Sequence, residues 1–284
     1  MNIGFIGAGK AGTALGRYLV DHQQTVVGYA SRTKASAEKA SAFTHTRFFS
    51  SATELAQASD LLFISTSDGA LSSVWQELCT ACDKGELNLE GKIIAHLSGC
   101  TSSAVFEHAS TFGASVCSAH PLLAFGDAKS AHLQLQTAHF SLEGDEYAVN
   151  TVRALLEKAG NSVHIMQATD KTRYHAAAVF ASNLVLAPLN TAVTILSTCG
   201  FSKEEAREAL EPLIRGNVDN FCNRGAAKAL TGPVERNDKK IVEAHLGSLD
   251  APTANLYRSL TASLLDIAKE RHPERTYEDW NDVI

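Results

Sequence analysis

Short apolar runs alternate with longer amphipathic stretches along the first part of this 284-residue chain. The clearest runs cover residues 3–6, 25–29, 61–64 and 92–95, and shorter candidates cover 115–118, 138–142 and 162–166. An amphipathic pattern at helical spacing covers residues 146–159, before the last of these runs. Such alternation is typical of βαβ units, which build a parallel sheet. We therefore expect an α/β domain with a doubly wound, mostly parallel sheet that ends near residue 166.

The pattern changes after residue 167, where long helical segments replace the short apolar runs. Helices are predicted over residues 169–198, 203–222, 238–245 and 253–272. Ser202 and Glu205 have the spacing of a capping box, in which each side chain bonds the backbone N–H of the other residue. The sequence therefore predicts two domains, 1–167 and an all-helical domain 168–284.

Residues 176–199 contain no charged side chain, and a stretch of this length raises the question of a membrane span. The stretch also contains several polar residues and a proline, namely Ser182, Asn183, Pro188, Asn190, Thr191 and Thr194. A helix buried inside protein accommodates this mixture better than lipid does. We therefore expect no membrane association.

Composition and charge narrow the class of protein further. The formal net charge of −6 leaves no basic stripe that could neutralise a nucleic-acid backbone, so we expect no nucleic-acid partner. The first residues lack the positive segment and long apolar core of a secretory signal, which favours a cytoplasmic location. Cys79 and Cys82 form one Cys-x-x-Cys pair, but four ligands are needed for structural zinc, so we predict packing at a helix end and no metal site.

A glycine-rich segment, Gly7-Ala8-Gly9-Lys10-Ala11-Gly12, follows the first apolar run and begins an expected helix. In a dinucleotide-binding turn the first glycine permits the tight bend, the second lets the backbone approach the pyrophosphate, and the third lets helix and strand pack closely. The helix N-terminus offers unpaired N–H groups to the anion. We therefore expect a Rossmann-type domain that binds a dinucleotide through these six residues.

The end of the second apolar run indicates which dinucleotide is bound. NAD-binding domains usually have Asp or Glu there, which bonds the ribose 2′-hydroxyl. This chain instead has Ser31, Arg32 and Thr33, whose hydroxyls and guanidinium suit a 2′-phosphate. NADP(H) is therefore favoured over NAD(H), with Arg32 as a solvated loop residue the alternative. The missing acid also argues against an S-adenosylmethionine-dependent methyltransferase.

Polar residues follow three further runs of the expected sheet. Thr66, Ser67 and Asp68 follow the third run, and Ser67 and Asp68 are expected to line the nicotinamide ribose, although Asp68 could equally cap the next helix. Ser98 and Gly99 follow the fourth run, beside His96, whose role is left open between structure and function. His120 follows the run at 115–118. Ligands bind beyond the carboxyl ends of parallel strands, so these residues are candidates for the site.

A second set of candidates lies at the start of the first long helix. Lys171 and His175 are four residues apart and share one helix face, Ser182 is nearly in line with Lys171, and Asn183 is about a third of a turn away. Hydride transfer to a carbonyl or imine needs a donor or positive charge near the heteroatom, and a group that can deliver a proton. Lys171, His175 and His120 are the residue types that meet these needs.

These segments together resemble the Rossmann-like proteins with a DUF2520-type C-terminal domain. That group is related to the 6-phosphogluconate and β-hydroxyacid dehydrogenases, ketopantoate reductase and pyrroline-5-carboxylate reductase. The resemblance covers nearly the whole chain, through residues 7–12, 31–33, 96–99, 120–121, 171–183 and 230–238. It implies a Rossmann domain, a helical dimerising domain like the 6-phosphogluconate dehydrogenase C-terminal domain, and substrate bound between them.

The resemblance also assigns roles to individual residues. In β-hydroxyacid dehydrogenases a Lys-x-x-x-Asn pair carries the chemistry, and here Lys171 matches the lysine while His175 stands in place of the asparagine. The stretch His120-Pro-Leu is similar to the His-Pro-Met stretch of prephenate dehydrogenases, in which the histidine polarises a substrate hydroxyl. Thr231 and Arg236 are expected to reach the substrate, with Arg236 on a carboxylate, or else to form only a helix-connecting turn set by Gly232 and Pro233.

We expect an NADP(H)-dependent oxidoreductase whose chemistry needs no metal ion.

 The expected reaction transfers hydride to or from a small carbonyl, imine or hydroxy-acid substrate. Lys171 would stabilise the developing oxyanion, His175 or His120 would transfer the proton, and Ser98 and Asn183 would orient the substrate. A homodimer through the helical domain is expected as the assembly. The alternatives are a dinucleotide-binding sensor without turnover and a dehydrogenase similar to prephenate dehydrogenase.

Overall fold

The computed structural model describes all 284 residues. They form two compact units, Met1–Ser182 and Asn183–Ile284. The last strand ends at Ile165, and the helix that follows, α7 (Lys171–Ala181), belongs to the first unit. The first unit therefore extends beyond residue 167, where strands were expected to give way to helices.

The first unit is built on an eight-stranded sheet with the strand order β3-β2-β1-β4-β5-β6-β7-β8. The strands are β1 (Asn2–Ile6), β2 (Thr25–Ala30), β3 (Arg47–Phe48), β4 (Leu61–Ile64), β5 (Ile93–His96), β6 (Ser115–Pro121), β7 (His139–Gly144) and β8 (Ser162–Ile165). Strands β1 to β6 are parallel to one another, whereas β7 is antiparallel to β6 and parallel to β8. The order reverses between β1 and β4, which is where a doubly wound sheet binds its ligand. The expected fold class is confirmed.

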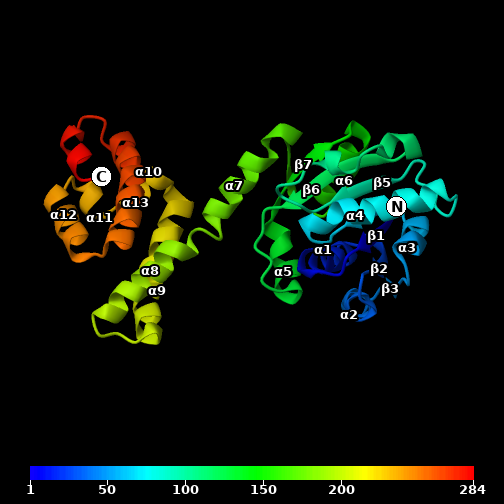
Figure 1. Cartoon of the computed structure of the whole chain (residues 1–284), viewed down its shortest axis with the longest axis horizontal. Helices are drawn as coiled ribbons and strands as arrows, with labels where there is room; N and C mark the ends of the chain where they lie inside the picture. Colours follow the sequence, from blue (N-terminus) through cyan, green and yellow to red (C-terminus); the bar gives the residue numbers. More distant parts are fainter. The chain divides into compact units, whose positions relative to one another are not determined.

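Helices cover both faces of this sheet (Figure 1). The helices are α1 (Lys10–Asp21), α2 (Lys34–Thr44), α3 (Ala52–Ala58), α4 (Leu71–Asp83), α5 (Ala128–Gln134) and α6 (Glu146–Lys158). Ile3, Phe5, Leu61 and Phe63 join one buried cluster with α1, α2 and α6, while Ile6, Leu62 and Ile64 join another with α3 and α4. Successive strand residues point to opposite faces, so each apolar run supplies two cores.

The second unit is helical throughout. Its helices are α8 (Leu186–Thr198), α9 (Lys203–Arg224), α10 (Ala226–Ala229), α11 (Gly232–Glu235), α12 (Lys239–Ser248) and α13 (Ala251–Arg271). Its core lies in the later part of the chain, where Trp280 and Val242 are fully buried beside Leu265 and Ala268. The predicted capping box at Ser202 and Glu205 is present at the start of α9.

The helix expected over residues 169–198 is two helices, α7 and α8, with a break at residues 182–185. Pro188 explains the break, because proline has no N–H and its ring clashes with the carbonyl four residues earlier. A helix that begins at Leu186 places Pro188 in its first turn, where neither problem arises. Pro188 was therefore the signal in the sequence for a break between the two helices.

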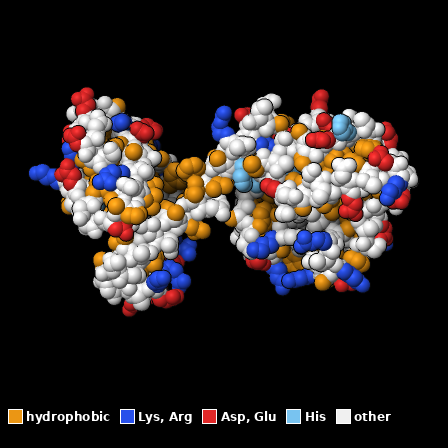
Figure 2. All heavy atoms as spheres, in the orientation of Figure 1, with side chains coloured by type: hydrophobic (Ala, Val, Ile, Leu, Met, Phe, Trp, Pro, Cys, Tyr) orange, Lys and Arg blue, Asp and Glu red, His pale blue; other side chains and the backbone are white.

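The apolar segment Ala168–Thr198 is long and apolar enough to cross a membrane by length and composition alone. None of its most apolar window is buried within this chain, so burial of the segment inside protein stays a prediction. Figure 2 shows hydrophobic side chains at the surface along this segment. Phe180 is 69% exposed and Leu186 is 63% exposed, and exposed apolar patches of this kind mark interaction surfaces.

Candidate functional site

The turn after β1 has the geometry that the glycine motif predicts. Gly7 has φ +103°, and a Cβ there would lie 2.8 Å from the backbone carbon of Ser65. A Cβ on Gly12 would lie 2.1 Å from the Ser65 hydroxyl oxygen, so a side chain there would displace β4 or α1. Ser65 itself donates a 2.9 Å hydrogen bond to the Gly7 carbonyl. The motif therefore holds α1 close to the sheet, as expected.

The N-terminus of α1 is open to an anion. Gly9 precedes the helix and offers no side-chain cap, and the first turn contains no acidic residue. Ala8 is half-buried, whereas Gly9 and Lys10 are exposed, so the backbone at this turn can be approached from solvent. Unpaired N–H groups at a helix N-terminus, together with the Lys10 ammonium, favour a bound phosphate.

Ser31, Arg32 and Thr33 lie beside this turn, because the Gly7 N–H donates a 2.8 Å hydrogen bond to the Ala30 carbonyl at the end of β2. Arg32 is exposed and makes no hydrogen bond or ion pair. Thr33 precedes α2 and its hydroxyl donates to Ser36 at 2.7 Å. A guanidinium without a protein partner is available to a phosphate beside the turn.

The residues after β4 form the next part of the same edge. The Thr66 hydroxyl is buried and has no hydrogen-bond partner. The Asp68 carboxylate accepts a 2.8 Å hydrogen bond from the Ser98 hydroxyl, and no side chain caps α4. Asp68 therefore does not cap α4, which was one of the two roles left open for it.

The segment after β5 is tied to its surroundings by Ser98. The Ser98 hydroxyl accepts from the N–H of Thr101 at 3.0 Å, and the Ser98 N–H donates to Nδ1 of His96 at 3.1 Å. His96 is fully buried, and burial, with the charge of Lys171 second, lowers its pKa to about 4. His96 is thus a neutral acceptor that holds the Ser98 segment in place.

Lys171 reaches from α7 into this segment and is only 1% exposed. Its ammonium donates to the Ser98 carbonyl at 2.8 Å and to the Ser118 hydroxyl, and it lies 3.8 Å from Oε1 of Glu143. Burial lowers the pKa of Lys171, while the Glu143 carboxylate acts in the opposite direction. The ammonium is therefore held by two hydrogen bonds and one buried ion pair.

Glu143, Ser103 and Ser118 are part of this network although the sequence did not single them out. Glu143 accepts from both the N–H and the hydroxyl of Ser103, each at 2.8 Å. It pairs with Ser118 across the antiparallel strands β6 and β7. Glu143 directly follows the buried strand residues Phe140 and Leu142, and a glutamate in such a strand is unusual. This position was the one signal in the sequence that could have identified Glu143.

His120 and His175 both lie against Gly99. A Cβ on Gly99 would be 2.6 Å from Nδ1 of His175 and 2.8 Å from Nε2 of His120. The two rings are nearly perpendicular, with centroids 6.1 Å apart. Nδ1 of His120 lies 2.7 Å from the Tyr174 hydroxyl, a residue that the sequence analysis missed. The structure thus brings Ser98, Gly99, His120, Lys171 and His175 together.

The remaining candidates lie in the second unit. Asn183 begins that unit, and Thr231 and Arg236 flank the short helix α11. Gly232 has φ +86° and Pro233 occupies the first turn of α11, so the helix-connecting turn is present. Arg236 is exposed. Contact of Asn183, Thr231 and Arg236 with a substrate stays a prediction.

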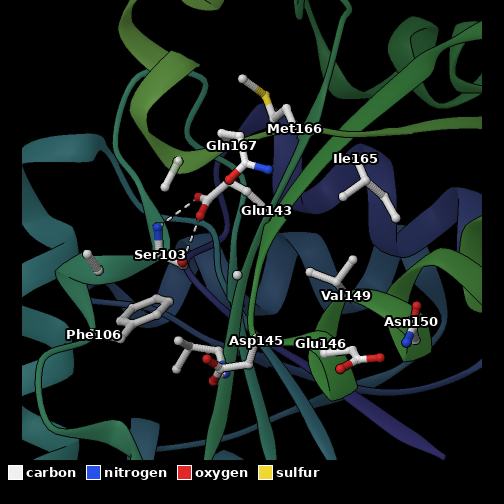
Figure 3. Close-up of a pocket in the computed structure, with 14 residues that line it drawn as sticks. Ser103, Phe106, Glu143, Asp145, Glu146, Val149, Asn150, Ile165, Met166 and Gln167 are labelled. Carbon is white, nitrogen blue, oxygen red and sulfur yellow. Dashed lines mark hydrogen bonds between the residues drawn. The ribbon is translucent and has the colours of Figure 1, made fainter.

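A cavity of about 580 Å³ lies elsewhere in the first unit and shares Glu143 with the Lys171 network. Figure 3 shows Ser103 bonded to the Glu143 carboxylate at its wall, with Phe106, Val149 and Ile165 nearby. None of the residues predicted from the sequence lines this cavity. The candidate site is therefore the polar edge of the sheet and not this cavity.

Comparisons with known proteins agree with this architecture. A protein from Thermotoga maritima is 25% identical, with a TM-score of 0.75, and the match covers 95% of this chain and 99% of that one. A proposed NADP oxidoreductase from Bacteroides fragilis is 22% identical, with a TM-score of 0.72 and coverage of 93% and 98%. An imine reductase from Myxococcus stipitatus in complex with NADP+ is 18% identical, with a TM-score of 0.63 and coverage of 96% and 95%. No curated protein sequence matches this chain.

Two family models match consecutive parts of the sequence. Residues 1–121 match the Rossmann-like domain, and residues 138–264 match the domain of unknown function DUF2520. The first match ends with β6, and the second includes β7, β8 and the helices up to most of α13. The chain therefore combines an N-terminal Rossmann-like domain with a C-terminal DUF2520 domain.

Proposed function

We propose that this protein is an NADP(H)-dependent oxidoreductase that transfers hydride to or from a small carbonyl, imine or hydroxy-acid compound. The observation that carries the proposal is the placement of the glycine turn and the unpaired Arg32 at adjacent strand ends. Ser98 follows β5 and His120 lies at the end of β6 in the same sheet, and His175 approaches them from α7. The structural relatives described as NADP oxidoreductase and imine reductase support the same reaction class.

The glycine turn would hold the pyrophosphate and Ser31, Arg32 and Thr33 the 2′-phosphate of the cofactor. The residues in this corner fit the group, since no carboxylate is present and Arg32 is unpaired. When bound, the nicotinamide supplies or accepts the hydride. Thr66 and Ser67 would line the cofactor's ribose, and the unpartnered Thr66 hydroxyl is free for that purpose.

The substrate-facing groups in this proposal are the two histidines and the Ser98 segment. His175 or His120 would exchange the proton that balances hydride transfer, because Nδ1 of His175 and Nε2 of His120 have no hydrogen-bond partner. Lys171 would act through the Ser98 carbonyl that it binds, since its ammonium is buried and hydrogen-bonded to protein oxygens. Lys171 is then a positioning residue whose positive charge stabilises negative charge developing on the substrate.

The proposal includes a homodimer through the helical unit. No side chain of α8 is buried, and Ala206 is the one buried residue of α9. Leu213 is 62% exposed and Phe221 is 58% exposed on α9. A second copy covering α8 and α9 would remove these apolar side chains from water. Asn183, Thr231 and Arg236 are proposed to contact the substrate in that assembly.

Fluorescence titration with NADPH, NADH and S-adenosylmethionine tests the cofactor. We expect NADPH to bind most tightly, and Arg32→Ala to weaken NADPH far more than NADH. Lys34→Ala is the matched control, because Lys34 is also exposed near the end of β2 but is paired with Glu38 at 3.6 Å. Absence of binding by either nicotinamide dinucleotide would overturn the proposal.

A panel of carbonyl, imine and hydroxy-acid compounds then tests turnover, read as NADPH oxidation or NADP+ reduction. Turnover of one class supports the oxidoreductase. Tight NADPH binding without turnover across the panel would favour the second candidate, a dinucleotide-binding sensor. The unpaired Arg32 and the open helix N-terminus support binding in either case, so turnover is the deciding measurement.

A further inference from the structure

His120 and Tyr174 form a hydrogen-bonded pair at the proposed site. His120 lies at the end of β6 and Tyr174 on the first turn of α7, and Nδ1 lies 2.7 Å from the phenol oxygen. The rings meet edge to face, with centroids 5.5 Å apart and planes at 89°. Nε2 of His120 is left without a hydrogen-bond partner. One nitrogen of the ring is thus fixed and the other is free.

The surroundings keep the His120 ring neutral and the Tyr174 phenol protonated. Burial, reinforced by the charge of Lys171 and by the neighbouring His175, lowers the pKa of His120 to about 4, so the ring is neutral at neutral pH. Burial raises the pKa of Tyr174, so the phenol keeps its proton, while the Ser141 hydroxyl bonded to it acts in the opposite direction. A neutral imidazole has one N–H and one lone pair. A phenol that donates to Nδ1 leaves the ring proton on Nε2.

The free Nε2 lies beside the Ser98 segment. It is 2.8 Å from the position that a Cβ on Gly99 would occupy, and His175 approaches the same position from the other side at 2.6 Å. Because Gly99 has no side chain, both rings can lie against its backbone. An N–H at Nε2 would thus be offered at the edge of the sheet where we place the substrate.

We propose that Tyr174 is a positioning residue that holds His120 as a neutral Nε2–H donor, and that the substrate accepts this hydrogen bond through a carbonyl oxygen. The inference rests on the proposed function and names the substrate class within it. A carbonyl oxygen has lone pairs for the N–H, whereas a protonated iminium nitrogen has none. The buried Lys171 ammonium also disfavours a second positive charge there.

The balance of the reaction follows from this assignment. The carbonyl carbon gains the hydride from NADPH, the C=O double bond becomes single, and NADP+ is formed. The oxygen gains a proton from His175 or from water, while His120 keeps its own proton. His120 therefore stabilises negative charge on the oxygen as a hydrogen-bond donor and does not act as an acid.

Four titratable groups face His120. They are Lys171, Tyr174 and His175 on α7, and His96 on β5. His96 is fully buried and Lys171 nearly so. The chain also contains a matched pair in the second unit, where the Tyr257 hydroxyl lies 2.9 Å from Nδ1 of His245 with the rings edge to face at 78°.

The test is ¹H–¹⁵N correlation spectroscopy of the full chain labelled with ¹⁵N-histidine, which reports the tautomer of each ring without any substrate. His120→Asn assigns the His120 signals. In the wild type we expect His120 to be neutral at pH 7 with its proton on Nε2 and to stay so below pH 5. A Tyr174→Phe variant should show mixed tautomers and a higher pKa at His120, since the phenol stabilises only the neutral ring.

Tyr257→Phe is the control, which should alter the His245 signals and leave those of His120 unchanged. The wild-type spectrum is decisive by itself, whether or not Tyr174→Phe folds. A cationic His120 ring at pH 7, or a neutral ring with its proton on Nδ1, would overturn the proposal. His120 signals in Tyr174→Phe identical to those of the wild type would overturn it as well.

The second arm measures turnover with carbonyl and imine compounds. We expect carbonyl reduction, with kcat lowered roughly tenfold in Tyr174→Phe and KM for NADPH unchanged, as befits one hydrogen bond. Turnover confined to imines would overturn the assignment of substrate class. Failure of the proposed function can be told apart from failure of this inference. A protein that binds no NADPH refutes the proposed function, but its spectrum still shows the His120 tautomer.

Discussion

Nζ of Lys171 lies 3.8 Å from Oε1 of Glu143, and both side chains are 2% exposed. The pair joins α7 to β7, and through Ser98 and Ser118 it also joins β5 and β6. A buried charge is stable only with a partner and with hydrogen bonds around it. The position of the Ser98 segment therefore depends on a glutamate that lies outside the predicted site.

Glu143→Gln should destabilise the first unit, because it leaves the Lys171 ammonium buried without a counter-charge. The loss in the free energy of unfolding should be about 3 to 5 kcal/mol, measured by urea unfolding at pH 7. Burial already lowers the pKa of Lys171 in the folded protein. The unfolded chain then binds more protons than the folded one as the pH approaches 10.5, so stability should rise with pH in that range, more steeply in the variant.

Glu157→Gln is the control for this experiment. Glu157 pairs with Arg153 at 2.7 Å, but both side chains are 46% exposed, and exposed pairs contribute little. The double variant Glu143→Gln with Lys171→Met should lose less stability than the two single variants together, because no charge is left buried. Equal effects of Glu143→Gln and Glu157→Gln would contradict the argument.

His96 should make the protein sensitive to acid. Burial lowers its pKa from 6.5 to about 4, so the unfolded chain takes up a proton at a higher pH than the folded one. Stability contributed by the neutral ring is present above pH 6.5 and is lost as the pH falls towards 4. The loss is on the order of 3 kcal/mol.

His96→Asn tests this contribution, since an amide oxygen can accept the Ser98 N–H without titrating. Urea unfolding between pH 7 and 4 should show a shallower loss of stability in this variant. His139→Asn, an exposed residue at the start of β7, is the matched control and should keep the wild-type slope. A wild-type slope in His96→Asn would show that other groups cause the acid sensitivity.

Gly99→Ala should disturb both histidines at once. The added Cβ would lie 2.6 Å from His175 and 2.8 Å from His120, so the rings or the backbone must move. A displacement of about 1 Å at a reacting group can reduce the rate by roughly a hundredfold. We expect a loss of kcat on this scale with NADPH binding retained, measured by steady-state kinetics and fluorescence titration.

Gly126→Ala serves as the control for this glycine, because a Cβ there would meet nothing within 4 Å. It should leave kcat and KM at wild-type values. If Gly99→Ala were as active as Gly126→Ala, the two rings would not need their positions against Gly99, and the proposed roles of His120 and His175 would lose their support.

The sequence predicted the features that depend on neighbouring residues. The glycine turn, most strands, the capping box at Ser202 and the alignment of Lys171 with His175 are local patterns. Glu143 and Tyr174 could not be predicted, because their roles depend on the pairing of β7 with β6 and on the orientation of α7. The strand β3 was missed because it contains only two residues, Arg47 and Phe48.

Phe221→Asp should weaken the proposed self-association of the helical unit. Phe221 is 58% exposed on α9, a helix with one buried residue, so a partner copy is needed to cover it. A carboxylate at the centre of an apolar interface costs several kcal/mol when it is buried without a partner. Sedimentation velocity of the wild type should show a dimer, and the variant should sediment as a monomer at the same concentration.

Leu133→Asp is the matched control, since Leu133 is 70% exposed on α5 in the first unit and should not affect association. NADPH binding should survive in Phe221→Asp, because the glycine turn and Arg32 lie in the other unit. A wild-type monomer that pellets with lipid vesicles would instead assign the exposed segment Ala168–Thr198 to a membrane. That result would refute the proposed dimer. The proposed cofactor site depends on the first unit alone and would be unaffected.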